Sequence, residues 1–150
     1  MKFPNLAIMA CLAAPVFAVG APAPPPARPV VVVAPAKISI IIGTVSLKLE
    51  PFVWNGSVYV SRYAATVFPY FLFNEHGMVM IDATDDQAGR LGRGEPISIV
   101  GRAVNSEGDK RRLECRITPA DKSSGAIKVR VVIPPGFTLT FNTTYKIGNK

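Results

Sequence analysis

Residues 112–133 read RLECRITPADKSSGAIKVRVVI, and this stretch decides the fold. Two runs of alternating apolar and charged residues flank a polar turn, and a period of two is the pattern of a β-strand with one buried face. The apolar positions are Leu113, Cys115 and Ile117 in the first run and Ile127, Val129, Val131 and Ile133 in the second. The stretch therefore predicts two antiparallel strands joined through residues 121–125.

The same period recurs along most of the chain. Turn residues separate the runs, for example Asn55-Gly56, the segment 75–77 and Pro134-Pro135-Gly136. Many short strands without long helices predict an all-β fold, either an antiparallel β-sandwich or a small barrel of about eight strands. Residues 85–91 predict one helical turn. The remaining predicted strands cover residues 38–40, 45–49, 58–62, 67–73, 78–81, 97–104 and 137–145.

The first residues of the chain indicate export. Residues 1–18 combine a basic start, an apolar run and the ending Val16-Phe17-Ala18, which is the pattern of a secretory signal peptide. Cleavage after Ala21 fits the same rule. The run is too interrupted for a transmembrane span, which needs about 20 apolar residues. We therefore expect a protein of the bacterial periplasm or exterior with no transmembrane span in the mature chain. Lipid anchoring at Cys11 fits less well, because the apolar segment before it is very short.

A proline-rich segment separates the signal from the folded part. Residues 19–36 read VGAPAPPPARPVVVVAPA, and each proline fixes φ and removes a backbone donor. We expect an extended linker here, in which the valines of 30–33 either dock as an edge strand or stay loose. Residues 37–150 are then one β-rich domain of ordinary size.

The chain offers little recognisable catalytic chemistry. Cys115 is left alone once the signal is removed, which predicts a buried strand cysteine and no internal disulfide. Asp82, Asp85 and Asp86 match no calcium-loop spacing and are better explained as helix-capping residues. Because the sequence has no nucleophile elbow, zinc motif or phosphate-binding loop, we assign no catalytic residue, no metal ligand and no cofactor.

His76 is the single histidine and the one candidate for proton transfer near neutral pH. It lies in the predicted turn at 75–77, where a solvent-exposed side chain explains it. The catalytic alternative is a small secreted enzyme that pairs His76 with Asp82, Asp85 or Asp86.

Basic residues gather on the polar face of the stretch quoted first. The chain has 17 Lys and Arg against 10 Asp and Glu, a formal net charge of +7. If neighbouring strands pair in order, one outer sheet face becomes basic, and Lys110 and Arg111 extend it at the hairpin. Such a face either meets an anionic envelope component, such as lipid head groups or wall polymer, or is simply solvated. Nucleic acid is not expected, because aromatic residues do not alternate with these positions. The face consists of Arg102, Arg112, Arg116, Lys128 and Arg130.

Aromatic residues cluster between Phe52 and Phe73. Most are expected in the core, since a domain of this size needs its aromatic side chains inside. Trp54, beside the Asn55-Gly56 turn, is the one expected at the surface. Together these patterns predict an exported binding or structural protein of the envelope, which meets its partner through the basic face, through the aromatic hairpin near Trp54, or through both. The alternatives are the enzyme centred on His76 and a subunit that donates the strand at 30–33 to a neighbour or meets a protein partner in another way.

Overall fold

The computed structural model describes residue 20 and residues 28–148. The predictions of a signal peptide, its cleavage sites and lipidation at Cys11 lie outside these residues. The described chain forms ten strands, one α-helix and one 3-10 helix. In chain order they are β1 (Val30–Val33), β2 (Ala36–Ile40), β3 (Gly43–Leu49), β4 (Val53–Trp54), β5 (Tyr59–Phe68), η1 (Phe71–Phe73), β6 (Glu75–Ile81), α1 (Asp85–Gly92), β7 (Ile97–Asn105), β8 (Lys110–Pro119), β9 (Ser124–Ile133) and β10 (Phe137–Gly148).

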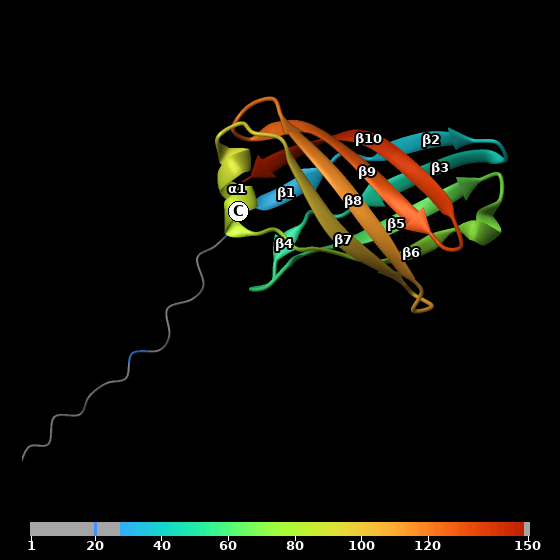
Figure 1. Cartoon of the computed structure of the whole chain (residues 1–150). Coiled ribbons are helices and arrows are strands. Elements are labelled where there is room, and N and C mark those ends of the chain that lie inside the picture. Colours follow the sequence, from blue (N-terminus) through green and yellow to red (C-terminus); the bar gives the residue numbers. More distant parts are fainter. Residues whose placement is uncertain (1–19, 21–27, 149–150) are drawn as a thin grey trace, which may run out of the picture.

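All ten strands belong to one antiparallel sheet. Its order is β1-β10-β9-β8-β7-β6-β5-β3-β2, with the short β4 paired to β5. The sheet curls round into a half-barrel, as Figure 1 shows. The prediction of an antiparallel all-β fold is therefore confirmed. The ten strands, where about eight were expected, form one curled sheet and not two separate ones.

The curl depends on a change of partner in the N-terminal strand segment. β1 pairs with β10, and the Ala34 N–H still donates to the Thr144 carbonyl at 2.9 Å. Pro35 follows, and from Ala36 onward the chain pairs with β3 instead. One short segment thus pairs with both β10 and β3, which lie near opposite edges of the sheet. The sheet begins at Val30, so the valine run docks as an edge strand within the segment expected to be linker.

The alternating pattern assigns the inner face correctly. In β8 and β9 every second side chain points into the concavity, and the register places Cys115 opposite Val129. The same alternation continues into β10, where Phe141 is almost fully buried. The buried inner residues of these three strands are Leu113, Cys115, Ile127, Val129, Phe141 and Tyr145.

Three local predictions are wrong. The strand expected over 67–73 ends at Phe68, because Pro69 cannot continue the ladder, and the chain turns through η1. The turn expected at 75–77 is consequently the start of β6. The single helical turn expected at 85–91 is an eight-residue helix, stabilised by a capping box in which Thr84 and Gln87 bond each other's backbone N–H.

Gly77 occupies a position in β6 that leaves no room for a side chain. A Cβ there would lie 2.0 Å from the Val104 carbonyl oxygen of β7. We predict that Gly77→Ala lowers the free energy of unfolding by about 1–3 kcal/mol, because the β7 backbone must move. Urea denaturation measures this change. Gly136→Ala is the control, since its Cβ would meet nothing within 4 Å. Equal stability of the two variants would contradict the close β6–β7 approach.

Candidate functional site: an apolar cavity with a buried polar cluster

The concave side of the sheet encloses a cavity of about 1090 Å³. Its wall consists mainly of the inward apolar side chains of the strands, among them Val45, Leu113 and Val129. Small-molecule sites in proteins usually measure about 300–1,000 Å³ and have mostly apolar walls. The half-barrel therefore has an interior large enough to hold a lipid-sized ligand.

The cavity reaches the seam between β2 and β10. The ladder between β1 and β10 begins at the Val33–Tyr145 pair, so the first half of β10 has no strand partner on this side within the described chain. Side chains from both sides of the seam line the cavity, namely Ile38 and Ile40 of β2 and Leu139 and Phe141 of β10. Apolar side chains therefore line the seam on both sides.

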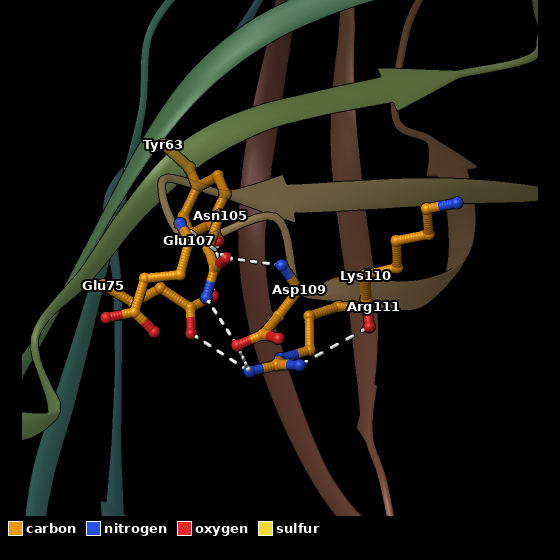
Figure 2. A network of polar contacts seen from close by, with 7 residues as sticks. All are labelled: Tyr63, Glu75, Asn105, Glu107, Asp109, Lys110 and Arg111. Carbon is orange, nitrogen blue, oxygen red and sulfur yellow. Dashed lines mark hydrogen bonds and ion pairs between the residues drawn. The ribbon is translucent and has the colours of Figure 1, made fainter.

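A polar cluster interrupts the apolar wall, and Figure 2 shows its contacts. The Tyr63 hydroxyl donates a short hydrogen bond to the Glu75 carboxylate. Arg111 Nη2 lies 3.3 Å from Glu75 Oε2 and 3.9 Å from Asp109 Oδ2. Tyr63, Glu75 and Arg111 all line the cavity. We call these three residues the polar cluster.

The loop between β7 and β8 fixes the position of Arg111. Asn105 Oδ1 accepts the N–H groups of Glu107 at 3.0 Å and of Asp109 at 2.7 Å, and its amide donates to Asp109 Oδ2 at 3.2 Å. This network, visible in Figure 2, holds Asp109 beside the guanidinium. The Arg111 side chain is only 17% exposed, and its Nε is buried without a hydrogen-bond partner among the described residues. A buried donor of this kind costs free energy unless something accepts from it.

Burial changes the acid–base properties of two residues in the wall. Burial raises the pKa of the Tyr63 hydroxyl far above its ordinary value, and the hydrogen bond and negative charge of Glu75 raise it further. Burial also raises the pKa of the Cys115 thiol to about 11. Because the thiolate is the reactive form, this burial disfavours a nucleophilic role for Cys115, which lines the cavity wall.

The structure brings the expected basic face together. The five residues Arg102, Arg112, Arg116, Lys128 and Arg130 are all exposed on the outer side of β7, β8 and β9. Arg102 pairs in register with Arg112, and Arg116 with Lys128, although like charges opposite each other disfavour pairing. Glu114 lies between Arg112 at 3.4 Å and Arg130 at 3.2 Å. Arg111 does not extend this face. It is two positions from Leu113 on the same strand, so its side chain points to the inner face and lines the cavity.

The aromatic residues depart from the expectation. Trp54 is only half-exposed, because the Arg28 guanidinium stacks 3.8 Å from the centre of its ring and Tyr59 packs edge-on against it. Phe52 and Tyr63 are buried as expected. The prediction of a core position is wrong for Phe68, Tyr70, Phe71 and Phe73, which are 49–65% exposed.

The structure does not bring His76 together with the aspartates that a catalytic site at His76 would need. His76 is near the start of β6 and Asp82 follows its end, so about six residues of extended chain, roughly 20 Å, separate them. Asp82 instead lies 3.8 Å from Arg102, and Asp85 pairs with Arg28 at 2.5 Å. Asp85 and Asp86 occupy the first turn of α1, where carboxylates favour the helix dipole, as expected of capping-region residues.

The sequence analysis missed the polar cluster, yet a signal for it was present. Arg111 is in phase with the apolar positions Leu113 and Cys115, and Glu75 is in phase with Val79. A charged residue in phase with a buried face is buried with it and needs a partner. Two such residues of opposite sign on different strands are candidates for a buried pair.

Comparison with known proteins assigns no family to this chain. No protein-family model, curated protein or solved structure matches it. Within residues 20 and 28–148, no helix has the length and apolar character needed to cross a membrane. The same residues contain no group of three or more His, Cys, Asp and Glu side chains placed to hold a metal ion. The cavity and the polar cluster are therefore the features of the described chain that point to a function.

The raised pKa of Tyr63 makes a prediction about alkaline stability. The folded state keeps its proton above the ordinary pKa of 10.0, so its contribution to stability is complete below pH 10 and is lost as the pH rises further. We predict that the free energy of unfolding falls above pH 10, and that Tyr63→Phe makes this fall shallower by up to about 1.4 kcal/mol per pH unit. Urea denaturation across this pH range measures the slope, with Tyr70→Phe, at an exposed tyrosine, as the control. An unchanged slope in Tyr63→Phe would contradict the buried, protonated hydroxyl.

Proposed function

We propose that this protein binds a single-chain amphiphile, with the acyl chain inside the half-barrel and the polar head at the polar cluster. The observation that carries the proposal is an apolar cavity of about 1090 Å³ whose wall includes one convergent polar cluster. This combination is the usual form of a small-molecule site. In this proposal the half-barrel works as a small barrel that is open along the seam between β2 and β10.

An acyl chain suits the wall better than a polar ligand does. Away from the polar cluster the inward side chains are mostly aliphatic or aromatic, so a peptide or sugar there would leave its polar groups without partners. Each methylene group removed from water contributes about 0.8 kcal/mol. The seam also supports this choice, because its apolar sides, including Ile40 and Leu139, let a chain enter sideways.

The polar cluster favours a neutral head over a carboxylate. Arg111 brings one formal positive charge, while Glu75 and Asp109 bring two negative ones within 4 Å of it. An anionic head would meet the two carboxylates, whereas a hydroxyl can donate to the Glu75 carboxylate and accept from the Arg111 guanidinium, both of which line the cavity. We therefore propose a head with hydroxyl groups, such as the glycerol of a monoacylglycerol.

Export to the envelope and a role for the basic face, both expected from the sequence, are compatible with lipid binding and remain proposals. Export to the envelope would place the protein among acyl lipids, and the basic face would approach their anionic head groups. Strand donation to a neighbour is the less favoured proposal, because Val30–Val33 already pairs with β10 of the same chain. A catalytic role of His76 receives no support from the placement of Asp82, Asp85 and Asp86.

Filling the cavity tests where the ligand binds. We predict that Leu139→Trp, which adds volume on the inner side of β10, weakens binding of a dansyl-labelled monoacylglycerol at least about tenfold, because the added ring takes the space of the chain. Asn142→Trp is the matched control, since Asn142 is exposed on the same strand and is not part of the wall. Fluorescence titration measures both affinities. Equal affinities for the two variants would contradict binding in the cavity.

Competition between two ligands with the same chain tests the head. We predict that mono-oleoylglycerol displaces the dansyl probe at several-fold lower concentration than oleate, because oleate brings a third carboxylate to the polar cluster. Glu75→Gln removes one carboxylate and should raise the affinity for oleate while changing that for mono-oleoylglycerol little. A preference for oleate in the wild type, or no effect of Glu75→Gln on it, would contradict the proposed head group.

A further inference from the structure

One end of the half-barrel carries most of the exposed large apolar side chains. In an antiparallel sheet of this order, the connections β2–β3, β5–β6, β7–β8 and β9–β10 lie at the same end, and Figure 1 shows them there. Eight of the twelve exposed large hydrophobic residues of the described chain lie on three of these connections. We call this set the apolar rim: Ile41, Ile42, Phe68, Tyr70, Phe71, Leu72, Phe73 and Phe137.

The apolar rim combines extreme exposure with an absence of charge. Leu72 is 97% exposed and Ile41 is fully exposed, although loop tips are where polar residues usually lie. Residues 38–47, 66–74 and 133–142, which contain the three tips, include no Asp, Glu, Lys or Arg. Contiguous exposed apolar surface of this kind marks an interaction site with a protein or a membrane.

The apolar rim is ordered by its own contacts. Pro69 and η1 fold the β5–β6 connection back, so that Phe68 and Phe71 pack edge to face with ring centres 5.8 Å apart. The β2–β3 tip lies close to it, because a Cβ at Gly43 would lie 2.0 Å from the Phe68 carbonyl oxygen and 3.1 Å from the Pro69 ring. These two tips therefore lie together at the end of the sheet.

The apolar rim is continuous with the cavity. Ile41, Ile42, Phe73 and Phe137 belong to the rim and also line the cavity. An acyl chain that leaves a bilayer at this end would pass from lipid to the rim and into the cavity without crossing water. A protein partner seated on the same side chains would instead cover this entrance.

The outer surface beside the apolar rim carries charges of both signs. Lys110 begins β8 at the fourth connection of this end, and Arg112 follows two residues later opposite Arg102. The same connection also includes the exposed acidic residues Glu107 and Asp109, so charge does not select the partner. The rim itself is uncharged and leads into the cavity proposed to hold an acyl chain, and apolar groups of this kind enter the head-group region of a bilayer. The continuity of rim and cavity therefore favours a lipid surface over an apolar patch on another protein.

We propose that the apolar rim docks on the surface of a lipid bilayer and that the cavity takes up its acyl ligand there. The proposal rests on the ligand binding proposed above and adds the place where the ligand is collected. The end of the molecule that carries the rim faces the bilayer, and β1 and α1 at the opposite end face away from it (Figure 1).

Flotation with lipid vesicles tests the proposal. The purified protein is mixed with phosphatidylcholine vesicles at high salt, where apolar contacts persist and surface electrostatics is screened. We expect the wild type to float and Phe71→Ser with Leu72→Ser to lower the bound fraction about tenfold. Val53→Ser with Val100→Ser is the control, because both valines are exposed away from the rim. All variants share the same N-terminal residues, so their difference reports the rim alone.

The outcomes separate docking from ligand binding. Phe71 and Leu72 do not line the cavity, so their double variant should bind the dansyl probe in vesicle-free solution like the wild type. A wild type that binds the probe but does not float, or a rim variant that floats equally well, would overturn the docking proposal and leave the cavity function standing. Flotation that occurs only with anionic vesicles at low salt would assign docking to the basic face instead. Rim-dependent flotation without probe binding would support docking and refute the cavity function.

Discussion

The structure depends on the change of partner at Pro35. Up to Ala34 the N-terminal strand segment bonds to β10, and from Ala36 it bonds to β3. The first ladder ends at this point, and the Thr143 hydroxyl secures the junction by donating to the Ala34 carbonyl at 2.8 Å. A segment of about ten residues thereby holds β10 near β3 and curls the sheet between them. Without this tie the sheet would have two distant edges and an open apolar face.

The curl explains why the interior can act as a site. In a two-layer fold the inward side chains of one sheet pack against a second layer and fill the space between them. Here the sheet faces itself, and side chains such as Val45 and Val129 line a cavity of about 1090 Å³. The incomplete ladder along the first half of β10 leaves this cavity a lateral seam. Four of the connections lie at one end of the sheet, and four residues of the apolar rim there also line the cavity.

Alternation in the sequence predicted most of the strands and both faces of β8 and β9. It also predicted the basic outer face, because period two assigns Arg112 and Arg116 to the side opposite Leu113 and Cys115. It could not predict the curl, which depends on contacts between residues more than a hundred positions apart, such as Ala34 and Thr144. A pattern along one strand shows which side chains share a face and not what lies across from them. The cavity therefore cannot be predicted from the sequence, although Arg111 and Glu75 can be recognised as charged residues that share a strand face with apolar ones.

The aromatic run shows a second limit of sequence reasoning. Residues such as Phe71 and Phe73 have the composition of a core segment, and burial is the usual fate of such residues. Pro69 ends the strand, and the segment after it becomes a loop tip whose rings point away from the sheet interior or toward the cavity mouth. Exposed apolar surface of this kind is typical of interaction sites.

Nuclear magnetic resonance of the protein with mono-oleoylglycerol tests the central claim most directly. The account predicts nuclear Overhauser effects between acyl-chain protons and the methyl groups of Leu113 and Val129, which face the cavity. It predicts none to Val100, which is exposed on the outer face of β7. Acyl-chain contacts to Val100 with none to Leu113 and Val129, or no contacts at saturating ligand, would contradict the claim that the interior of the half-barrel is the binding site.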